Sequence, residues 1–249
     1  MNMLDLIDII IPTYNNSDYT IQCLKSIKKN TVVPYRIIWI DDGSTMAEYQ
    51  RVLIELKEWG IDHVVYRTEK NIGFAKAVNV GIRLSGSDPI VLLNNDVVVT
   101  KGWLRRLIYG FGINKKIGII GAMTNKCGSN QQYERLMRYL RRPVPKEPEK
   151  YFRDLDPETI PVNSNISYFC TAISRKVINK IDLLDEDFMN GGEDDDYNDR
   201  ARLAGFKTNI ALNCFVWHEH EATRRKVLDQ KTRKRNLDLY LKKKAERRI

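Results

Sequence analysis

Short apolar runs alternate with amphipathic segments along the first half of the chain. The apolar runs, each about as long as one strand, cover residues 7–12, 36–40, 63–67 and 89–93. The amphipathic segments between them cover residues 17–29, 47–59 and 73–84. Runs that are apolar at successive positions are typical of strands buried on both faces, and helical periodicity between them is typical of crossover helices. The pattern therefore predicts an α/β fold with an open, doubly wound and mostly parallel sheet.

The regular alternation ends after a further apolar run at residues 117–122. Residues 125–162 are polar and basic and contain five prolines, so we expect a long excursion with one helix near residues 133–140. A connection of this length in a compact domain is usually functional or disordered. Beyond it, the pattern predicts strands at residues 167–174 and 207–217 and helices at residues 175–181 and 194–203.

A chain of 249 residues is long enough for one large α/β domain with its own core. We expect residues 1–223 to form this domain, with an N-terminal half at residues 1–124 and a smaller half at residues 125–223. The net charge is +9, and residues 224–249 hold 12 Lys and Arg against 3 Asp and Glu. The whole excess of positive charge therefore lies in a basic C-terminal helix or tail.

Two interpretations of this tail stay open. Its apolar side chains give an irregular stripe on a helix, formed by Val227, Leu228, Leu237, Leu239, Tyr240 and Leu241. Such a helix, with its basic end, is suited to peripheral contact with an anionic membrane. It is equally suited to packing on its own domain. Nucleic acid is not expected as a partner, because no aromatic stacking platform accompanies the positive charge.

The cysteines and the apolar segments favour a cytoplasmic protein, and the basic tail leaves peripheral contact at the inner face of a membrane as an alternative. Four scattered cysteines without a CxxC pair predict neither a zinc site nor a disulfide framework. The longest apolar runs are far shorter than the roughly 18 residues that span a bilayer, and the first eight residues are acidic where a signal peptide is basic.

Polar clusters follow three of the predicted strands, at residues 13–16, 41–44 and 94–96. In open α/β sheets, ligands bind beyond the carboxyl ends of the strands. We therefore expect these clusters to converge on one crevice.

Five segments resemble, in the same order, the motifs of family 2 inverting glycosyltransferases, which have the GT-A fold. They are Ile10-Ile11-Pro12-Thr13-Tyr14-Asn15, Asp41-Asp42-Gly43-Ser44, the spaced set Asn71, Gly73, Phe74, Ala77, Asn79 and Gly81, then Asn94-Asn95-Asp96 and Gly191-Gly192-Glu193-Asp194-Asp195-Asp196. The fourth segment has Asn94 where the family motif Asp-x-Asp begins, in the style of rhamnosyltransferase-like members. The resemblance implies a hexosyltransferase of glycan biosynthesis that uses a nucleoside-diphosphate sugar, with UDP- or dTDP-sugars favoured.

The resemblance also implies where the donor binds. Pro12, Thr13, Tyr14 and Asn15 correspond to residues that contact the base and ribose, although such residues alone are typical of an ordinary turn. Asp42, with Asp41 as the alternative, corresponds to the carboxylate that accepts a hydrogen bond from the imide of uracil or thymine. Asn71 is placed to cap the helix that follows Gly73, whose N-terminus suits a phosphate or sugar oxygen. Lys76 either reaches the diphosphate or is a solvated surface residue.

The metal site is expected at the fourth motif. Asn94 and Asn95 lead to Asp96, and a carboxylate suits Mn²⁺ or Mg²⁺, which are commonly held by one or two carboxylates together with substrate phosphates. Asp96 alone is also typical of a strand end. His218 occupies the place where related sequences complete the metal site with a histidine, and His220 is the competing candidate.

Asp194 corresponds to the family's catalytic base, and the other half of the site is expected to take the acceptor. Inversion requires a base that deprotonates the acceptor hydroxyl as it attacks opposite the leaving diphosphate. The neighbouring acids are also typical of a helix N-terminus, which they stabilise. The acceptor is a glycan, a lipid-linked sugar or a protein. The remaining alternatives are a catalytically inactive sugar-nucleotide or glycan-binding module and a nucleotidyltransferase, for which the phosphate loop is missing.

Overall fold

The computed structural model describes residues 6–162, 165–219 and 230–247. His220, Val227 and Leu228 lie outside the described residues, as do the first five residues, on which part of the signal-peptide argument depends. The described strands are β1 (Ile7–Thr13), β2 (Tyr35–Asp41), β3 (His63–Arg67), β4 (Ile90–Leu93), β5 (Val97–Val99), β6 (Ile117–Thr124), β7 (Thr159–Pro161), β8 (Cys170–Ile173) and β9 (Lys207–His218). The described helices are α1 (Ser17–Asn30), α2 (Met46–Glu58), α3 (Phe74–Leu84), α4 (Trp103–Ile108), α5 (Gly110–Ile113), α6 (Tyr133–Tyr139), α7 (Pro148–Arg153), α8 (Arg175–Ile181), α9 (Glu193–Leu203) and α11 (Gln230–Glu246).

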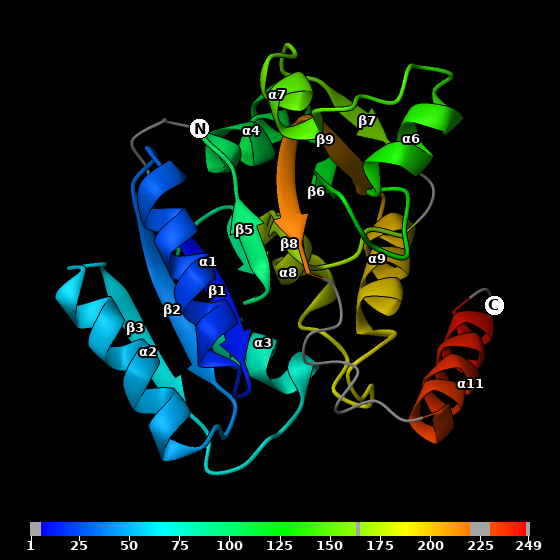
Figure 1. Ribbon diagram of the computed structural model, residues 1–249. Coiled ribbons are helices and arrows are strands. Elements are labelled where there is room, and N and C mark those ends of the chain that lie inside the picture. The colour runs from blue at the N-terminus through cyan, green and yellow to red at the C-terminus, as the bar shows by residue number, and fades with distance from the viewer. Residues whose placement is uncertain (1–5, 163–164, 220–229, 248–249) are drawn as a thin grey trace.

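One sheet runs through the molecule in the strand order β3-β2-β1-β4-β8-β6-β9-β5 (Figure 1). The short strand β7 pairs with residues 209–211 of β9. The strands β3, β2, β1 and β4 are parallel to one another. β8 is antiparallel to both of its neighbours, β4 and β6, while β6 and β9 are parallel. The predicted α/β fold with a doubly wound sheet is therefore confirmed, and its antiparallel pairs are confined to the half of the sheet beyond β4.

Both faces of the sheet are buried, which explains the continuous apolar runs. Successive side chains of a strand point to opposite faces. Ile9 and Ile11 of β1 accordingly pack with helices α1, α2 and α4, whereas Ile10 packs with α3 and α8 on the other face. Each face therefore carries its own apolar core, with the sheet between them.

The long excursion of residues 125–162 contains the predicted helix, now α6, and two elements that the sequence pattern did not predict. Helix α7 and strand β7 are short, and β7 is ordered by pairing Thr159 and Ile160 with Ala211 and Ile210 of β9. The strand expected at residues 167–174 is shorter than predicted, because β8 begins only at Cys170. The three residues before Cys170 instead extend beyond the sheet.

The basic C-terminal segment forms helix α11, which packs beside α9 (Figure 1). Of the two open interpretations of the tail, packing on the chain's own α/β body is therefore observed. Leu237 and Leu241 are exposed on α11, whereas Asn236 is buried. None of the helices in the described residues is long and apolar enough to cross a membrane.

Candidate functional site

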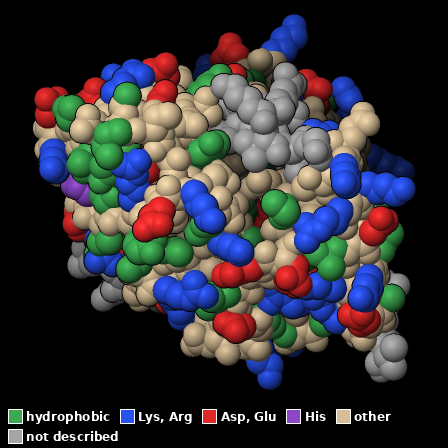
Figure 2. Space-filling model, turned by 90° about the horizontal axis from the view of Figure 1, so that it is seen from below, with side chains coloured by type: hydrophobic (Ala, Val, Ile, Leu, Met, Phe, Trp, Pro, Cys, Tyr) green, Lys and Arg blue, Asp and Glu red, His purple; other side chains and the backbone are tan. Residues whose placement is uncertain are grey.

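A cavity of about 650 Å³ lies at the edge of the sheet where β1, β2, β4 and β9 end. The antiparallel strands β5 and β8 begin at the same edge, because Val97 pairs with His218 and Cys170 pairs with Leu93. On the face seen from below in Figure 2, Lys and Arg side chains lie among Asp and Glu side chains over the described residues. The polar clusters that follow the strands thus meet as predicted.

Most of the predicted site residues line this one cavity. Those that do are Pro12, Thr13, Tyr14, Asp42, Asn71, Asn94, Asn95, Asp96, Asp194 and His218. Three others, Asn15, Gly73 and Lys76, are not among its lining residues. The chain therefore brings together residues that are more than a hundred positions apart in the sequence.

The turn after β1 is fixed by the neighbouring strand and loop. The Thr13 hydroxyl accepts a hydrogen bond of 2.8 Å from the Trp39 indole nitrogen and is buried. Asn15 has a left-handed backbone, with φ of 53°, and its side chain accepts a hydrogen bond of 3.0 Å from the Thr45 amide. The sequence analysis placed Asn15 beside the base and ribose of the donor. In the structure Asn15 instead bonds to the loop after β2 and does not line the cavity.

Asp42 joins the end of β2 to the start of α3. Its two carboxylate oxygens accept hydrogen bonds from the amides of Ile72, at 2.8 Å, and Gly73, at 3.0 Å. Burial raises the pKa of Asp42 above its ordinary value, and these two amide bonds act in the opposite direction. The Thr68 hydroxyl donates to the same carboxylate at 3.2 Å, so about one of the roughly four acceptor positions of a carboxylate remains for a further donor.

The alternative candidate, Asp41, is not a lining residue of the cavity. Its carboxylate is buried and lies 3.1 Å from the Arg67 guanidinium nitrogen. The two adjacent aspartates therefore have different surroundings, and Asp42 is the one that faces the cavity.

The start of α3 differs from the sequence prediction. The cap position is Gly73, with φ of 92°, and Asn71 does not cap the helix. The amide of Phe74 instead donates to the Asn190 side chain at 2.9 Å, which links α3 to the segment before α9. Lys76 points from α3 to an exposed position outside the cavity lining, so the solvated interpretation of this residue fits the structure.

Asp96 and His218 lie side by side because β5 and β9 pair there. Nε2 of His218 is 3.3 Å from an oxygen of Asp96, and both side chains are largely buried. Nδ1 of His218 is 3.1 Å from the Lys126 carbonyl, and the Phe169 ring stacks on the imidazole with centroids 4.9 Å apart. A hydrogen bond from Nδ1–H to this carbonyl leaves the Nε2 lone pair directed toward Asp96.

The two asparagines before Asp96 hold the turn between β4 and β5. The Asn94 amide donates to the Phe169 carbonyl at 2.8 Å, so this turn is tied to the segment before β8. The Asn95 side chain donates to the Thr20 hydroxyl at 3.0 Å on α1. Asn94 is half-buried and Asn95 is buried, and both line the cavity.

Asp194 is the second residue of α9, whose cap position is Gly192 with φ of 96°. One of its carboxylate oxygens accepts a hydrogen bond of 2.9 Å from the Asp195 amide. The next acid, Asp195, is bonded to the Asn165 side chain, and its pKa is raised by burial. Asp194 thus lies at an ordered helix start and lines the same cavity as the β4–β5 turn.

Further lining residues come from the region that the sequence only broadly assigned to the acceptor side. They are Cys127, Gly128, Ser129, Asn130, Arg135, Asn165, Ser167, Tyr168 and Phe169, together with Asn190. Arg135 donates to the Gly128 carbonyl at 2.7 Å, which orders the loop after β6. The polarity of residues 125–165 was the only sequence signal for this wall, since its shape depends on packing between distant segments.

The sequence matches the family model described as "Glycosyl transferase family 2" over residues 8–182. The chain belongs to glycosyl transferase family 2. The match covers more than half of the chain and includes the first four of the five motifs. The motif at the start of α9 and His218 lie beyond the matched residues.

Two curated relatives illustrate this similarity. Glycosyltransferase GlyG of Streptococcus pneumoniae is 29% identical over 105 residues, which are 42% of this chain and 35% of GlyG. Chondroitin synthase of Pasteurella multocida is 23% identical over 257 residues, which cover 92% of this chain and 26% of the synthase. The chain thus spans about a third or less of the length of these relatives.

Solved structures show the same fold. The mannosyltransferase PcManGT from Pyrobaculum calidifontis, in complex with GDP-Man and Mn²⁺, has a TM-score of 0.68 at 13% identity, covering 87% of this chain and 57% of its own. GalNAc-T7, with UDP, GalNAc and Mn²⁺, has a TM-score of 0.67 at 19% identity, covering 86% of this chain and 44% of its own. The α/β fold of this family 2 chain is therefore of the GT-A type.

Proposed function

We propose that this chain transfers a hexose, with inversion, from a nucleoside-diphosphate sugar to a hydroxyl group of an acceptor. The observation that carries the proposal is the position of Asp96 and Asp194 in one cavity of about 650 Å³. Cavities of this size suit small ligands and cofactors. We assign residues 1–124 to the donor half, residues 125–223 to the acceptor half, and residues 224–249 to a C-terminal appendage.

On the donor side, Pro12, Thr13 and Tyr14 would hold the base and ribose, with Asn71 nearby. Asp42 would accept a hydrogen bond from the imide of uracil or thymine, so we favour UDP- and dTDP-sugars. The remaining acceptor capacity of its buried carboxylate supports this role. Solved neighbours bind GDP-Man in one case and UDP in another, so the base is a matter for measurement.

Asp96 and His218 fit a divalent cation such as Mn²⁺ or Mg²⁺. A carboxylate oxygen and an imidazole nitrogen 3.3 Å apart supply two suitable ligand atoms on one side of the cavity. The carbonyl of Lys126 orients the imidazole from behind. Within the described residues no group of three or more His, Cys, Asp or Glu side chains is placed to hold a metal, so the donor diphosphate would complete the ligand set. A bound cation would stabilise the negative charge that develops on the leaving diphosphate.

Asp194 would take the proton from the acceptor hydroxyl as its oxygen attacks the anomeric carbon. Its place at the start of α9, on a different element from Asp96 but in the same cavity, supports this role, which requires attack from the side away from the leaving group. Gly191 and Gly192 leave the backbone beside this carboxylate without bulky side chains. The acceptor, whether glycan, lipid-linked sugar or protein, would approach along the wall formed by residues 127–130, Asn165 and residues 167–169.

A panel of nucleotide sugars tests this proposal. The full chain is incubated with Mn²⁺ and UDP-, dTDP- or GDP-sugars, and thermal stability and donor consumption are measured. A ligand that binds only the native state raises the melting temperature. We expect UDP- or dTDP-sugars to give the largest shift and to be consumed. Binding without any consumption would indicate a sugar-nucleotide-binding module, and no binding at all would overturn the proposal.

Peripheral contact of the C-terminal helix with an anionic membrane also remains a proposal. The exposed side chains of Leu237 and Leu241, four positions apart on α11, support it. Cosedimentation with vesicles of phosphatidylserine and phosphatidylcholine tests it. Vesicles of phosphatidylcholine alone are the control.

A further inference from the structure

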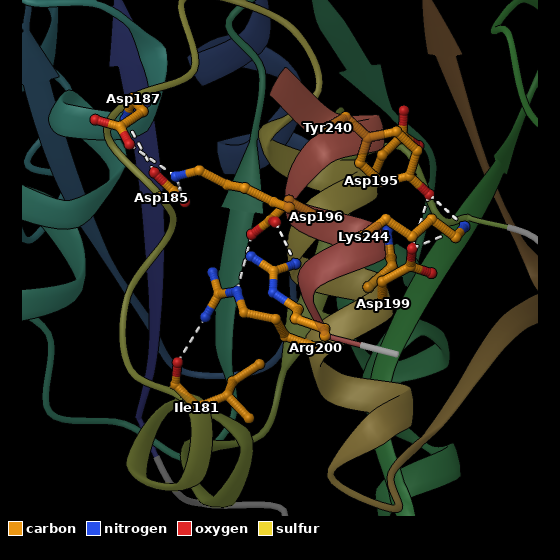
Figure 3. A network of polar contacts seen from close by, with 12 residues as sticks. Ile181, Asp185, Asp187, Asp195, Asp196, Asp199, Arg200, Tyr240 and Lys244 are labelled. Atoms are coloured by element: carbon orange, nitrogen blue, oxygen red, sulfur yellow. Dashed lines mark hydrogen bonds and ion pairs between the residues drawn. The ribbon is translucent and has the colours of Figure 1, made fainter. Parts of the chain in front are cut away.

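We propose that α11 is a positioning element of the active site, which holds the N-terminus of α9 and therefore the base Asp194 in place. This inference rests on the proposed function for Asp194, whereas the contacts that carry it involve other residues. Figure 3 shows the charged part of these contacts, in which Tyr240 and Lys244 of α11 lie beside Asp199 and the neighbouring acids of α9.

The acidic segment requires external positive charge. Residues 185–199 contain eight Asp and Glu and no Lys or Arg. Like charges so close together oppose one another, and the cost increases where the side chains are buried. Arg200 compensates part of this charge, since its Nε lies 2.8 Å from Asp196. Arg202 pairs with Asp199, and Arg83 lies 3.8 Å from Glu186. Helix α11 adds three further cations, Lys243, Lys244 and Arg247.

The first set of α11 contacts is with the loop before α9. Asn236 is buried and forms two hydrogen bonds with Met189, accepting from its amide at 3.4 Å and donating to its carbonyl at 2.8 Å. The Lys243 ammonium pairs with the carboxylates of Asp185 and, at 2.7 Å, Asp187. This loop is therefore held by both backbone and charged contacts.

The second set of α11 contacts is with α9 itself. The Tyr240 hydroxyl donates to Asp199 at 2.7 Å, and the Lys244 ammonium lies 2.9 Å from the same carboxylate oxygen. Arg247 forms an ion pair of 2.5 Å with Asp196, whose side chain is completely buried. Loss of Arg247 would leave Arg200 as the close cation on this buried carboxylate, and incomplete compensation of a buried charge is costly.

The two sets of α11 contacts lie on either side of the segment that lines the cavity. Residues 190–195 line it, whereas the residues bonded to α11 come before this segment, up to Met189, and after it, from Asp196 onward. Asn236 also lies close to Gly192, since a Cβ atom at Gly192 would be 3.9 Å from that of Asn236. Loosening α11 therefore frees both ends of the segment that carries Asp194. Correct orientation of a catalytic group contributes strongly to rate.

The test compares two triple variants of the full chain that remove the same number and kind of charges. Lys243→Gln/Lys244→Gln/Arg247→Gln removes the inward cations of α11. Lys231→Gln/Arg233→Gln/Lys234→Gln removes two lysines and one arginine from exposed positions of the same helix. Hydrogen–deuterium exchange of peptides covering residues 185–199 reports positioning without any donor or acceptor. Isothermal calorimetry with UDP and Mn²⁺ reports the donor half, and kcat and KM are measured with the most actively consumed nucleotide sugar.

We expect faster exchange over residues 185–199 and a kcat reduced about tenfold or more in the inward variant, in line with the effect of a small misplacement. Its UDP affinity should stay within about twofold, because the donor residues are held by β1, β2 and α3. The outward variant should match the wild type in all three measurements. Arg247→Lys should recover part of the loss that Arg247→Gln causes.

Two results would overturn the inference. One is unchanged exchange over residues 185–199 in the inward variant, and the other is an equal loss of kcat in both triple variants. If the wild-type chain consumes none of the nucleotide sugars, the proposed function fails. In that case the exchange comparison still decides whether α11 positions the segment.

Discussion

At the residue scale, the neighbours of each cavity side chain fix its orientation and its hydrogen-bonding state. His218 is the clearest case, because the Lys126 carbonyl and the stacked Phe169 ring fix the imidazole while Nε2 faces Asp96. Asp42 shows the same principle, since two backbone amides of the α3 start hold its carboxylate. Such second contacts orient a ligand-binding group before the ligand arrives.

The substitution Asp96→Ala tests the metal role. It leaves His218 as the remaining close metal ligand of the pair, so the affinity for UDP in the presence of Mn²⁺ should fall by at least about tenfold, or about 1.4 kcal/mol. Without Mn²⁺ the affinities of variant and wild type should be similar. Calorimetry under both conditions measures this, with Asp62→Ala as the control because Asp62 is exposed in the connection before β3. Equal Mn²⁺-dependent affinities in variant and wild type would contradict the assignment.

The sequence predicted most of these residues but not all their contacts. Thr13, Asp42 and Asp96 follow strands that end at one edge, so their convergence follows from the order of elements. Asn15 and Lys76 belong to the same motifs, yet neither lines the cavity. Which side chain of a turn faces inward depends on its backbone angles and on neighbours such as Thr45, which a motif does not record.

At the element scale, α9 and α11 form a unit whose stability depends on charge. Burial opposes ionisation of Asp199, but hydrogen bonds from Tyr240, Lys244 and Arg202 outweigh it and hold its pKa below the ordinary value. Asp185 is similar, because its bonds to Lys243 and to the Asp187 amide overcome the effect of burial and leave its pKa lowered. These carboxylates therefore favour the folded state when they are ionised.

The substitution Asp199→Asn should show this dependence on pH. A carboxylate with a lowered folded pKa stabilises the protein above its unfolded pKa, about 3.9, and this contribution is lost as the pH falls through the folded value. The variant should therefore melt below the wild type at pH 7, and the difference should shrink below about pH 4. Melting curves from pH 7 to pH 3 measure it. Asp238→Asn, at an exposed position of α11, is the control. A difference that stays constant or grows toward low pH would contradict the pKa assignment.

Elements with long apolar runs were predictable, and short ones were not. Strands β1 and β2 are buried on both faces, so their composition alone identifies them. Strand β7 has three residues, two of them half-buried, and exists because β9 supplies its hydrogen-bonding partner. Helix α11 has basic residues on its inner face that meet the acids of residues 185–199. This complementarity is visible in the sequence only when the two distant segments are compared.

At the scale of the whole molecule, the sheet brings a donor side and an acceptor side to one cavity. The parallel strands β1, β2 and β4 carry the motifs near the donor, β9 adds His218 beside Asp96, and α9 and the segment before β8 supply further lining residues of the same cavity. The central claim is that Asp96 and Asp194 act on the same bound donor from two sides. The fold makes this arrangement possible because the antiparallel strand β8 places residues 167–169 beside the β4–β5 turn.

The most direct test of this claim is the substitution Asp194→Asn, which keeps the size of the side chain and removes its basicity. We predict that consumption and transfer of the donor sugar fall by at least about 100-fold, as expected for loss of a general base, while UDP affinity with Mn²⁺ stays within about twofold of the wild type. Asp238→Asn serves as the control for activity. Transfer at the wild-type rate by the Asp194→Asn protein would contradict the account.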